Sequence, residues 1–409
     1  SNGPGITTTL GTTTTETGDE TQDTSDTTDT TTEGPTTTQD PSAGTSPCMN
    51  DEECPVEGEF CVEGFCEYDP NYCGEAEVME VPYTPPNVIL VLDKSGSMVN
   101  PDLNWDDDAD DADDDGFKDD DPMTMATPKV SRWRSLHEVV TLIGESFDDK
   151  INLGANLFPS TDAQAVLGPA ACLVNTDPEV SVAYMNAAQV LAGIPPAGAL
   201  DLEGGTPAEK GVSAAYNHLK GLAGNNDPVA ILVTDGAANC STSAPNDMAL
   251  LDYDENLVPT VAAAFNTDTI PTYVVGIDIS SEPDNQGIIT FDVLNDLANA
   301  GGVPKDDPME KFYNATNKDE LALALELIVG QTIDCTIELP DGIPDNTEPS
   351  IEVGGMAYPE LDGPECGMDD GWILDEGADP VTIELCGAAC GAFQESGELD
   401  LSFTCTDVG

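Results

Sequence analysis

The chain has 409 residues, a length typical of two to four domains. It carries 11 Lys and Arg residues against 79 Asp and Glu residues, so its formal net charge is −68 at pH 7. This charge repels phosphate backbones and anionic lipids, which excludes binding to nucleic acids or membrane surfaces through basic patches. No apolar run approaches the ~20 residues that a membrane-spanning helix needs, so we expect no transmembrane segment.

Residues 1–47 form a threonine-rich segment. It contains 19 threonines among Asp, Glu, Gly, Pro and Ser, and almost no large apolar side chain. Such a composition buries too little apolar surface to offset the entropy lost on folding, so we predict a disordered stalk. The stalk is either a passive linker or a spacer that holds the protein away from a cell envelope.

A cysteine-dense module at residues 48–82 follows the stalk. It holds five of the chain's 12 cysteines and few apolar residues, so disulfides must supply the stability that a core would otherwise give. No cysteines of the chain have C-x-x-C spacing, which argues against zinc or thioredoxin-like chemistry. We therefore expect disulfides formed in an oxidising compartment, and hence an exported protein.

Residues 83–333 alternate between strand-like and helix-like stretches. Val-, Ile- and Leu-rich strands that alternate with helices are typical of a mostly parallel sheet with helices on both faces. We predict an α/β domain here, between the disulfide-rich N-terminal module and a C-terminal β module. The expected strands are 87–92, 151–158, 229–234 and 270–277, and the expected helices are 131–147, 206–222, 256–266, 288–298 and 318–328.

An acidic insert at residues 102–121 follows the first predicted strand. It contains 12 aspartates, and part of it matches the opening of an EF-hand-type calcium loop with Gly116 at the turn. The last ligand position of that motif is Pro122 instead of an acidic residue. Two interpretations stay open, a Ca²⁺-binding loop beside the binding face and a solvated acidic loop. The candidate calcium ligands are Asp111, Asp113, Asp115 and Asp119.

Residues 334–409 have a third pattern. Short alternating runs are separated by Gly, Pro and Asp turns, which predicts a β module of four or five strands that contains five cysteines. The expected strands are 336–339, 351–353, 381–385 and 399–403.

Oxygen-bearing side chains gather at the ends of the predicted strands in the α/β domain. Asp93, Ser95 and Ser97 follow the first strand, Thr206 opens a helix after two glycines, and Asp235 directly follows the 229–234 strand. Ligand sites of open α/β sheets lie at the carboxyl ends of strands, so these groups are candidates for one site. Carboxylates and hydroxyls are hard donors that suit Mg²⁺, Mn²⁺ or Ca²⁺ better than zinc or copper.

The order Asp-x-Ser-x-Ser, Gly-Gly-Thr-Pro and Thr-Asp-Gly across residues 87–330 resembles the von Willebrand factor A (vWA) domain family. The resemblance implies a Rossmann-like domain with a metal-ion-dependent adhesion site, or MIDAS, that binds Mg²⁺ or Mn²⁺. Ser95 and Ser97 would ligate the metal directly, and Thr206 would do so in the ligand-bound state. Asp93 and Asp235 would act mostly through water.

Such a site binds acidic groups for a physical reason. Coordination dominated by hydroxyls leaves the charge of the cation poorly neutralised, and a partner's carboxylate can replace the water at an open position. We therefore expect an adhesion protein that captures an acidic group of an extracellular protein or glycan. The alternative is a calcium-stabilised structural surface protein, a fibre or coat subunit that self-associates.

Catalysis has little support in the sequence. The only histidines, His137 and His218, fall on predicted helices, and Ser95 has no evident histidine partner. A metal-dependent enzyme is disfavoured because no general base accompanies the metal loop. We expect that the protein is not an enzyme.

The cysteine counts suggest a pairing scheme. The two cysteines of the α/β domain, Cys172 and Cys240, would pair with one another, and each flanking module then keeps an odd number. Because the two chain ends lie near each other in the vWA fold, the resemblance implies a bridge between Cys73 and Cys335, the cysteines closest to those ends.

The threonine-rich start resembles that of surface lipoproteins of myxobacteria-like bacteria. This resemblance implies an extracellular or cell-surface location, with a lipid anchor on a residue that precedes Ser1.

Overall fold

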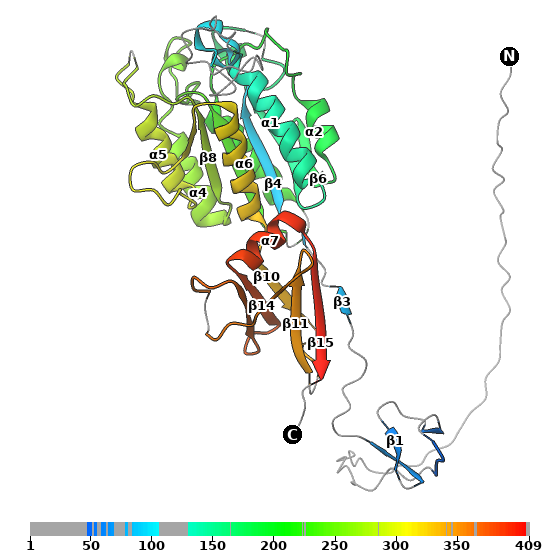
Figure 1. Cartoon of the computed structure of the whole chain (residues 1–409). Helices are drawn as coiled ribbons and strands as arrows, with labels where there is room; N and C mark the ends of the chain where they lie inside the picture. Colours follow the sequence, from blue (N-terminus) through cyan, green and yellow to red (C-terminus); the bar gives the residue numbers. More distant parts are fainter. Residues whose placement is uncertain are drawn as a thin grey trace, which may run out of the picture. The chain divides into compact units, whose positions relative to one another are not determined.

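Figure 1 shows a computed structural model of the chain. Its residues fall into two compact units, Ser1–Asp69 and Pro70–Gly409. The predicted stalk and most of the acidic insert lie outside the described residues. The structure describes residues 47–50, 53–54, 59–62, 64–68, 78–80, 84–105, 130–163, 165–222, 224, 226–284, 286–340, 342–344, 347–363 and 366–405.

The first unit contains a two-stranded antiparallel hairpin, β1 (Glu59–Val62) and β2 (Phe65–Tyr68). Two disulfides fasten it, Cys48–Cys61 and Cys54–Cys66. Phe60, Val62 and Phe65 of the hairpin are exposed, so the crosslinks supply stability that burial of these side chains does not.

A six-stranded mixed sheet organises the second unit, with the strand order β6-β5-β4-β7-β8-β9. All neighbouring strands run parallel except β6, which pairs with β5 in the antiparallel direction. The strands are β4 (Asn87–Asp93), β5 (Asn152–Phe158), β6 (Val180–Tyr184), β7 (Pro228–Thr234), β8 (Thr272–Ile277) and β9 (Tyr313–Ala315).

Helices cover both faces of this sheet (Figure 1). Residues of β4 alternate between two cores: Leu90 belongs to the cluster that includes buried residues of α1, α2 and α6, and Val91 belongs to the cluster that includes buried residues of α3, α4 and α5. This burial on both faces explains the continuous apolar runs that predicted the strands, and it confirms the α/β prediction. The helices are α1 (Arg132–Phe147), α2 (Ala187–Gly193), α3 (Ala208–Gly221), α4 (Leu257–Asp268), α5 (Thr290–Ala300) and α6 (Lys318–Thr332).

Two smaller sheets and a helix form the C-terminal part of this unit, ordered β10-β14-β13 and β12-β11-β15-β3. The four predicted strands are confirmed, whereas β12, β13 and α7 were not predicted. Residues of β3 were assigned to the cysteine-rich module, but this strand pairs with β15. The elements are β3 (Val78–Glu80), β10 (Thr336–Leu339), β11 (Thr347–Val353), β12 (Met356–Tyr358), β13 (Gly371–Asp375), β14 (Val381–Cys386), α7 (Ala388–Ser396) and β15 (Leu399–Cys405).

The α/β part and the C-terminal sheets share one hydrophobic core. Ile328 and Val329 of α6 belong to the same cluster of buried residues as Ile337 of β10 and Phe393 of α7. The Nε2 atom of Gln394 also donates a hydrogen bond to the carbonyl of Ile333, where α6 ends. The second unit is therefore one packed body and not two separately packed domains.

Three disulfides of the second unit lie among the described residues: Cys172–Cys240, Cys335–Cys390 and Cys366–Cys386. The first is the pairing expected from the sequence. The expected bridge between Cys73 and Cys335 is wrong, because the unpredicted helix α7 brings Cys390 to a Cα–Cα distance of 5.5 Å from Cys335. Cys73 itself lies outside the described residues.

Candidate metal-binding site

The two carboxylates of the predicted site stand at the ends of neighbouring parallel strands. Asp93 is the last residue of β4, and Asp235 directly follows β7. Because β4 and β7 pair in parallel, their carboxyl ends meet at the same edge of the sheet.

Hydrogen bonds join these carboxylates to the predicted serines. The Ser95 amide donates to Asp93 Oδ1 at 2.8 Å, and the hydroxyls of Ser95 and Ser97 lie 2.9 Å apart. The Ser97 hydroxyl in turn donates to Asp235 Oδ1 at 2.7 Å, across 138 residues of sequence. We call Asp93, Ser95, Ser97 and Asp235 the Asp93 cluster.

Burial makes the charges of this cluster unfavourable in the metal-free protein. Asp93 is fully buried, and this burial, together with repulsion from Asp235, raises the pKa of Asp93 to about 7. Burial also raises the pKa of Asp235, although Arg132 opposes that change. A divalent cation among these oxygens would offset the repulsion between the two carboxylates.

The segment that carries Thr206, the fifth predicted residue, contacts the serine loop through a backbone hydrogen bond. The amide of Gly96, between the two serines, donates to the carbonyl of Gly204 at 3.2 Å. Thr206 and Asn239 are linked twice: the Thr206 amide donates to Asn239 Oδ1 at 2.8 Å, and the Asn239 amide donates to the Thr206 carbonyl at 2.9 Å. Asn239, which the sequence analysis did not select as a site residue, therefore fixes the Thr206 segment.

The Cys172–Cys240 disulfide stands behind the same segment. The amide of Gly205 donates to the carbonyl of Ala171, the neighbour of Cys172, at 3.0 Å. A Cβ atom on Gly205 would approach Asn239 Oδ1 to 2.7 Å and Cys240 Sγ to 2.8 Å. Residue 205 of this loop therefore has room only for glycine unless its neighbours shift.

This crowding predicts opposite outcomes for two glycine variants. Gly205→Ala should destabilise the protein by about 1–3 kcal/mol and weaken metal binding, because its Cβ displaces the segment that carries Thr206. Gly236→Ala, next to Asp235, meets no atom within 4 Å and should change neither property. Thermal unfolding and Mn²⁺ titration of both variants test this, and equal behaviour of the two would contradict it.

Two buried cations near the cluster were not predicted. Arg132, the first residue of α1, donates from Nη1 to Asp235 Oδ2 at 3.0 Å and from Nη2 to Asp278 Oδ2 at 2.5 Å. Lys94 is also buried, but its Nζ points to the carbonyl of Glu203 at 3.3 Å. A basic residue in the first turn of a helix interacts unfavourably with the helix dipole. This unusual position was the feature of the sequence that could have identified Arg132 as a site residue.

The donors of the site fit a hard divalent cation. Hydrogen bonds link the hydroxyls of Ser95 and Ser97 to the carboxylate of Asp235, and the Asp93 carboxylate accepts from the Ser95 amide. Oxygen ligands of this kind suit Mg²⁺ or Mn²⁺. Both oxygens of Asp93 already accept bonds, from the Ser95 amide and from the Thr234 hydroxyl at 2.7 Å. This arrangement suits a role for Asp93 in orienting the serine loop.

Most of the acidic insert lies between two described residues that pair with one another directly before α1. Trp105, which lies within the insert, and Val130 exchange two backbone hydrogen bonds of 3.1 and 2.9 Å, directly before α1 begins. The indole of Trp105 also donates to the Ser135 hydroxyl of α1 at 3.0 Å. The candidate calcium ligands lie outside the described residues, so the calcium loop stays a prediction: Asp111, Asp113, Asp115 and Asp119.

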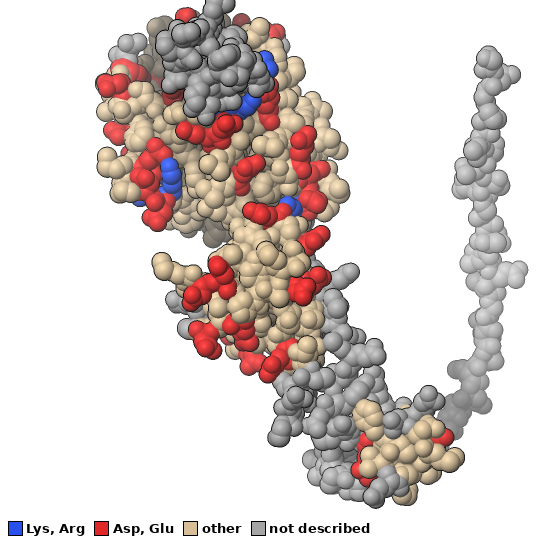
Figure 2. All heavy atoms as spheres, in the orientation of Figure 1, with Lys and Arg blue, Asp and Glu red and all other residues tan. Residues whose placement is uncertain are grey.

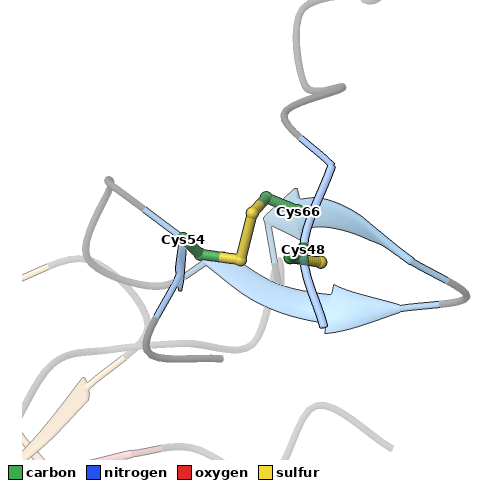
Figure 3. Close-up of side chains that lie close together, drawn as sticks. All are labelled: Cys48, Cys54 and Cys66. Atoms are coloured by element: carbon green, nitrogen blue, oxygen red, sulfur yellow. A yellow bond between two sulfur atoms is a disulfide. The ribbon is translucent and has the colours of Figure 1, made fainter. Parts of the chain in front are cut away.

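In the part of the chain that the structure describes, other metal-ligating side chains do not form a competing site. Among the described residues, the only close group of three or more His, Cys, Asp or Glu side chains is Cys48, Cys54 and Cys66. Figure 3 shows the disulfide that joins Cys54 to Cys66, and Cys48 is bonded to Cys61. These sulfurs are therefore crosslinks and are not free to bind a metal.

Both histidines lie on helices, as expected. His218 of α3 accepts a hydrogen bond from the Val182 amide at its Nε2 atom, and His137 lies on α1. Their contacts are structural: His218 holds the edge strand β6 against α3.

Acidic side chains are scattered over the visible face of the second unit, with few Lys or Arg residues among them (Figure 2). Over the described part of the chain, no helix combines the length and apolar character needed to cross a membrane.

No protein-family model matches the chain, and the comparison with curated proteins gives no match. Among solved structures, the chain is similar to the pilus adhesin SpaC from Lactobacillus rhamnosus GG, with 14% identity, a TM-score of 0.44, and coverage of 78% of this chain and 39% of SpaC. It is also similar to the PilB minor pilin of Streptococcus sanguinis (19% identity, TM-score 0.35, 60% of this chain, 61% of PilB). A third is the pilus adhesin RrgA of Streptococcus pneumoniae (10% identity, TM-score 0.35, 82% of this chain, 58% of RrgA).

These findings correct the family assignment. Because no family model matches and the similar structures are described as pilus adhesins and minor pilins, the assignment to the vWA family is not supported, nor is its Rossmann-like fold name. The physical reason is that any parallel α/β sheet can present carboxylates and hydroxyls at its strand ends, so short loop motifs report local chemistry and not ancestry.

Proposed function

We propose that this chain is an extracellular adhesion protein that holds Mg²⁺ or Mn²⁺ in the Asp93 cluster and captures an acidic group of a partner. The observation that carries the proposal is the hydrogen-bonded convergence of Ser95, Ser97 and Asp235 at one edge of the sheet. The disulfides support an oxidising, extracellular compartment.

The chemistry of the partner follows from the donors. Two carboxylates and neutral hydroxyls leave a bound dication able to attract a further anionic oxygen, such as a carboxylate of a protein or an acidic glycan. The net charge of −68 repels any partner that is acidic throughout. The proposed partner therefore offers an isolated acidic group on a surface that is otherwise neutral or basic.

Loss of one hydroxyl should abolish metal-dependent adhesion. Ser97→Ala removes a donor from the cluster, and we expect retention on a panel of immobilised extracellular proteins and glycans to fall to the level seen in EDTA. The panel is measured with Ca²⁺ constant and Mg²⁺ or Mn²⁺ varied, and Asp93→Ala should behave like Ser97→Ala.

Ser243→Ala is the matched control, because Ser243 forms a similar hydroxyl pair with Ser241 at 2.9 Å outside the cluster. It should bind like the parent chain. If parent, Ser97→Ala and Ser243→Ala are retained alike and Ca²⁺ alone assembles the protein, the adhesion proposal fails in favour of a self-associating structural protein.

A further inference from the structure

Arg132 has an unusual position for a basic side chain. It is almost fully buried at the first position of α1, where the helix dipole disfavours positive charge. Among the described residues its Nε atom has no hydrogen-bond partner, so the guanidinium is not held by a complete set of acceptors. The position of the guanidinium is instead explained by the two carboxylates that it bridges, Asp235 and Asp278.

The two carboxylates differ in their surroundings. The Asp235 side chain is fully buried and belongs to the Asp93 cluster, whereas the Asp278 side chain is 51% exposed at the end of β8. Arg132 therefore joins a candidate metal ligand to an acidic group outside the cluster. Asp278 has a φ of +54°, a left-handed conformation that a non-glycine residue rarely adopts.

A cation that bonds Asp235 competes with a metal for the same negative charge. Asp235 Oδ1 accepts from Ser97 and Oδ2 accepts from Arg132, so each of its oxygens is engaged in the metal-free protein. A dication that enters the cluster must share Asp235 with the guanidinium and experience its positive charge.

We propose that Arg132 is an internal counter-cation that competes with the divalent metal for Asp235, and that Asp278 sets the strength of this competition. The proposal rests on the proposed function, since it assumes that the Asp93 cluster binds the metal. In the metal-free protein Arg132 neutralises a buried carboxylate, and when a metal binds, Asp278 draws the guanidinium toward solvent.

Two substitutions should shift metal affinity in opposite directions. Arg132→Gln removes the competing charge, so Mn²⁺ should bind at least about tenfold more tightly in calorimetric titration. Asp278→Asn removes the carboxylate that draws Arg132 away from Asp235, so Mn²⁺ should bind a few-fold more weakly. In the Arg132→Gln background, Asp278→Asn should have little further effect on the Mn²⁺ affinity.

Metal-free stability gives a second readout. Arg132→Gln should lower the unfolding temperature more in EDTA than in saturating Mn²⁺, because the metal replaces the lost counter-charge. Arg134→Gln is the matched control, since Arg134 lies on the same helix but is half exposed and pairs only with Glu138 among the described residues. It should leave the Mn²⁺ affinity unchanged.

The outcomes separate this inference from the proposed function. If the parent chain binds Mn²⁺ but Arg132→Gln and Asp278→Asn leave the affinity unchanged or shift it in the same direction, the competition is refuted and the metal site stands. If the parent chain binds no Mn²⁺, the proposed function fails and the competition fails with it. Should Arg132→Gln not fold, the substitution of the exposed Asp278 by Asn still shows whether the Mn²⁺ affinity shifts in the predicted direction.

Discussion

Replacing Cys172 and Cys240 by serine should lower the free energy of unfolding by about 4 kcal/mol. The bridge joins residues 68 positions apart, and opening a loop of that length restores much conformational entropy to the unfolded chain. The same change should weaken Mn²⁺ binding about tenfold to a hundredfold, the usual effect of losing a group that orients metal ligands. Denaturant unfolding and Mn²⁺ titration measure the two effects.

The reason for a coupled effect lies in the Thr206 segment. This segment bonds to Ala171 on one side and to Asn239 on the other, and the disulfide ties those two loops together. Without the bridge each loop can move independently, so Thr206 loses its fixed position at the cluster.

The matched control is the Cys366–Cys386 bridge, which spans 20 residues in the C-terminal part. Replacing both of these cysteines by serine should lower the stability by about 3 kcal/mol and leave the Mn²⁺ affinity unchanged. If both double variants weaken Mn²⁺ binding equally, the effect is global destabilisation, and the positioning role of Cys172–Cys240 is refuted.

The sequence predicted the parts of the structure that depend on local pattern. The runs at β4 and β7 are largely apolar because both faces of the sheet are covered, and the carboxylates of the site stand where the two strands end: Asp93 closes β4, and Asp235 directly follows β7. The edge strand β6 escaped prediction because its side chains are largely exposed and it lacks a continuous apolar run.

Other features escaped prediction because they depend on contacts between residues that are far apart in the sequence. Arg132 meets Asp235 and Asp278 across 103 and 146 residues, and no local pattern encodes such a pair. Similarly, Cys390 reaches Cys335 through a helix whose short, small-residue sequence has weak periodicity. The family name failed for the opposite reason, since a local loop pattern was extended to the whole domain.

Ionisation of the Asp93 carboxyl should make the metal-free protein less stable as the pH rises from about 4 to about 7. The Asp93 carboxyl has a pKa of about 7 in the folded protein and 3.8 as its ordinary value. Between these values the folded state holds a proton that the unfolded state has lost, so raising the pH favours unfolding. The difference is on the order of 4 kcal/mol at full extent, and the contribution is constant above pH 7.

Asp93→Asn isolates this contribution from that of the many other carboxylates. Asparagine keeps an acceptor for the Ser95 amide but cannot titrate, so the variant should lose less stability than the parent over the same pH range in EDTA. Saturating Mg²⁺ should flatten the profile of the parent, because the metal binds the deprotonated carboxylate, and should leave the variant nearly unchanged. Parallel profiles of stability against pH for parent and variant in EDTA would show that Asp93 does not carry the proton. The repulsion between the two buried carboxylates would then have to be offset by another charge, for which the candidate is Arg132, bonded to Asp235.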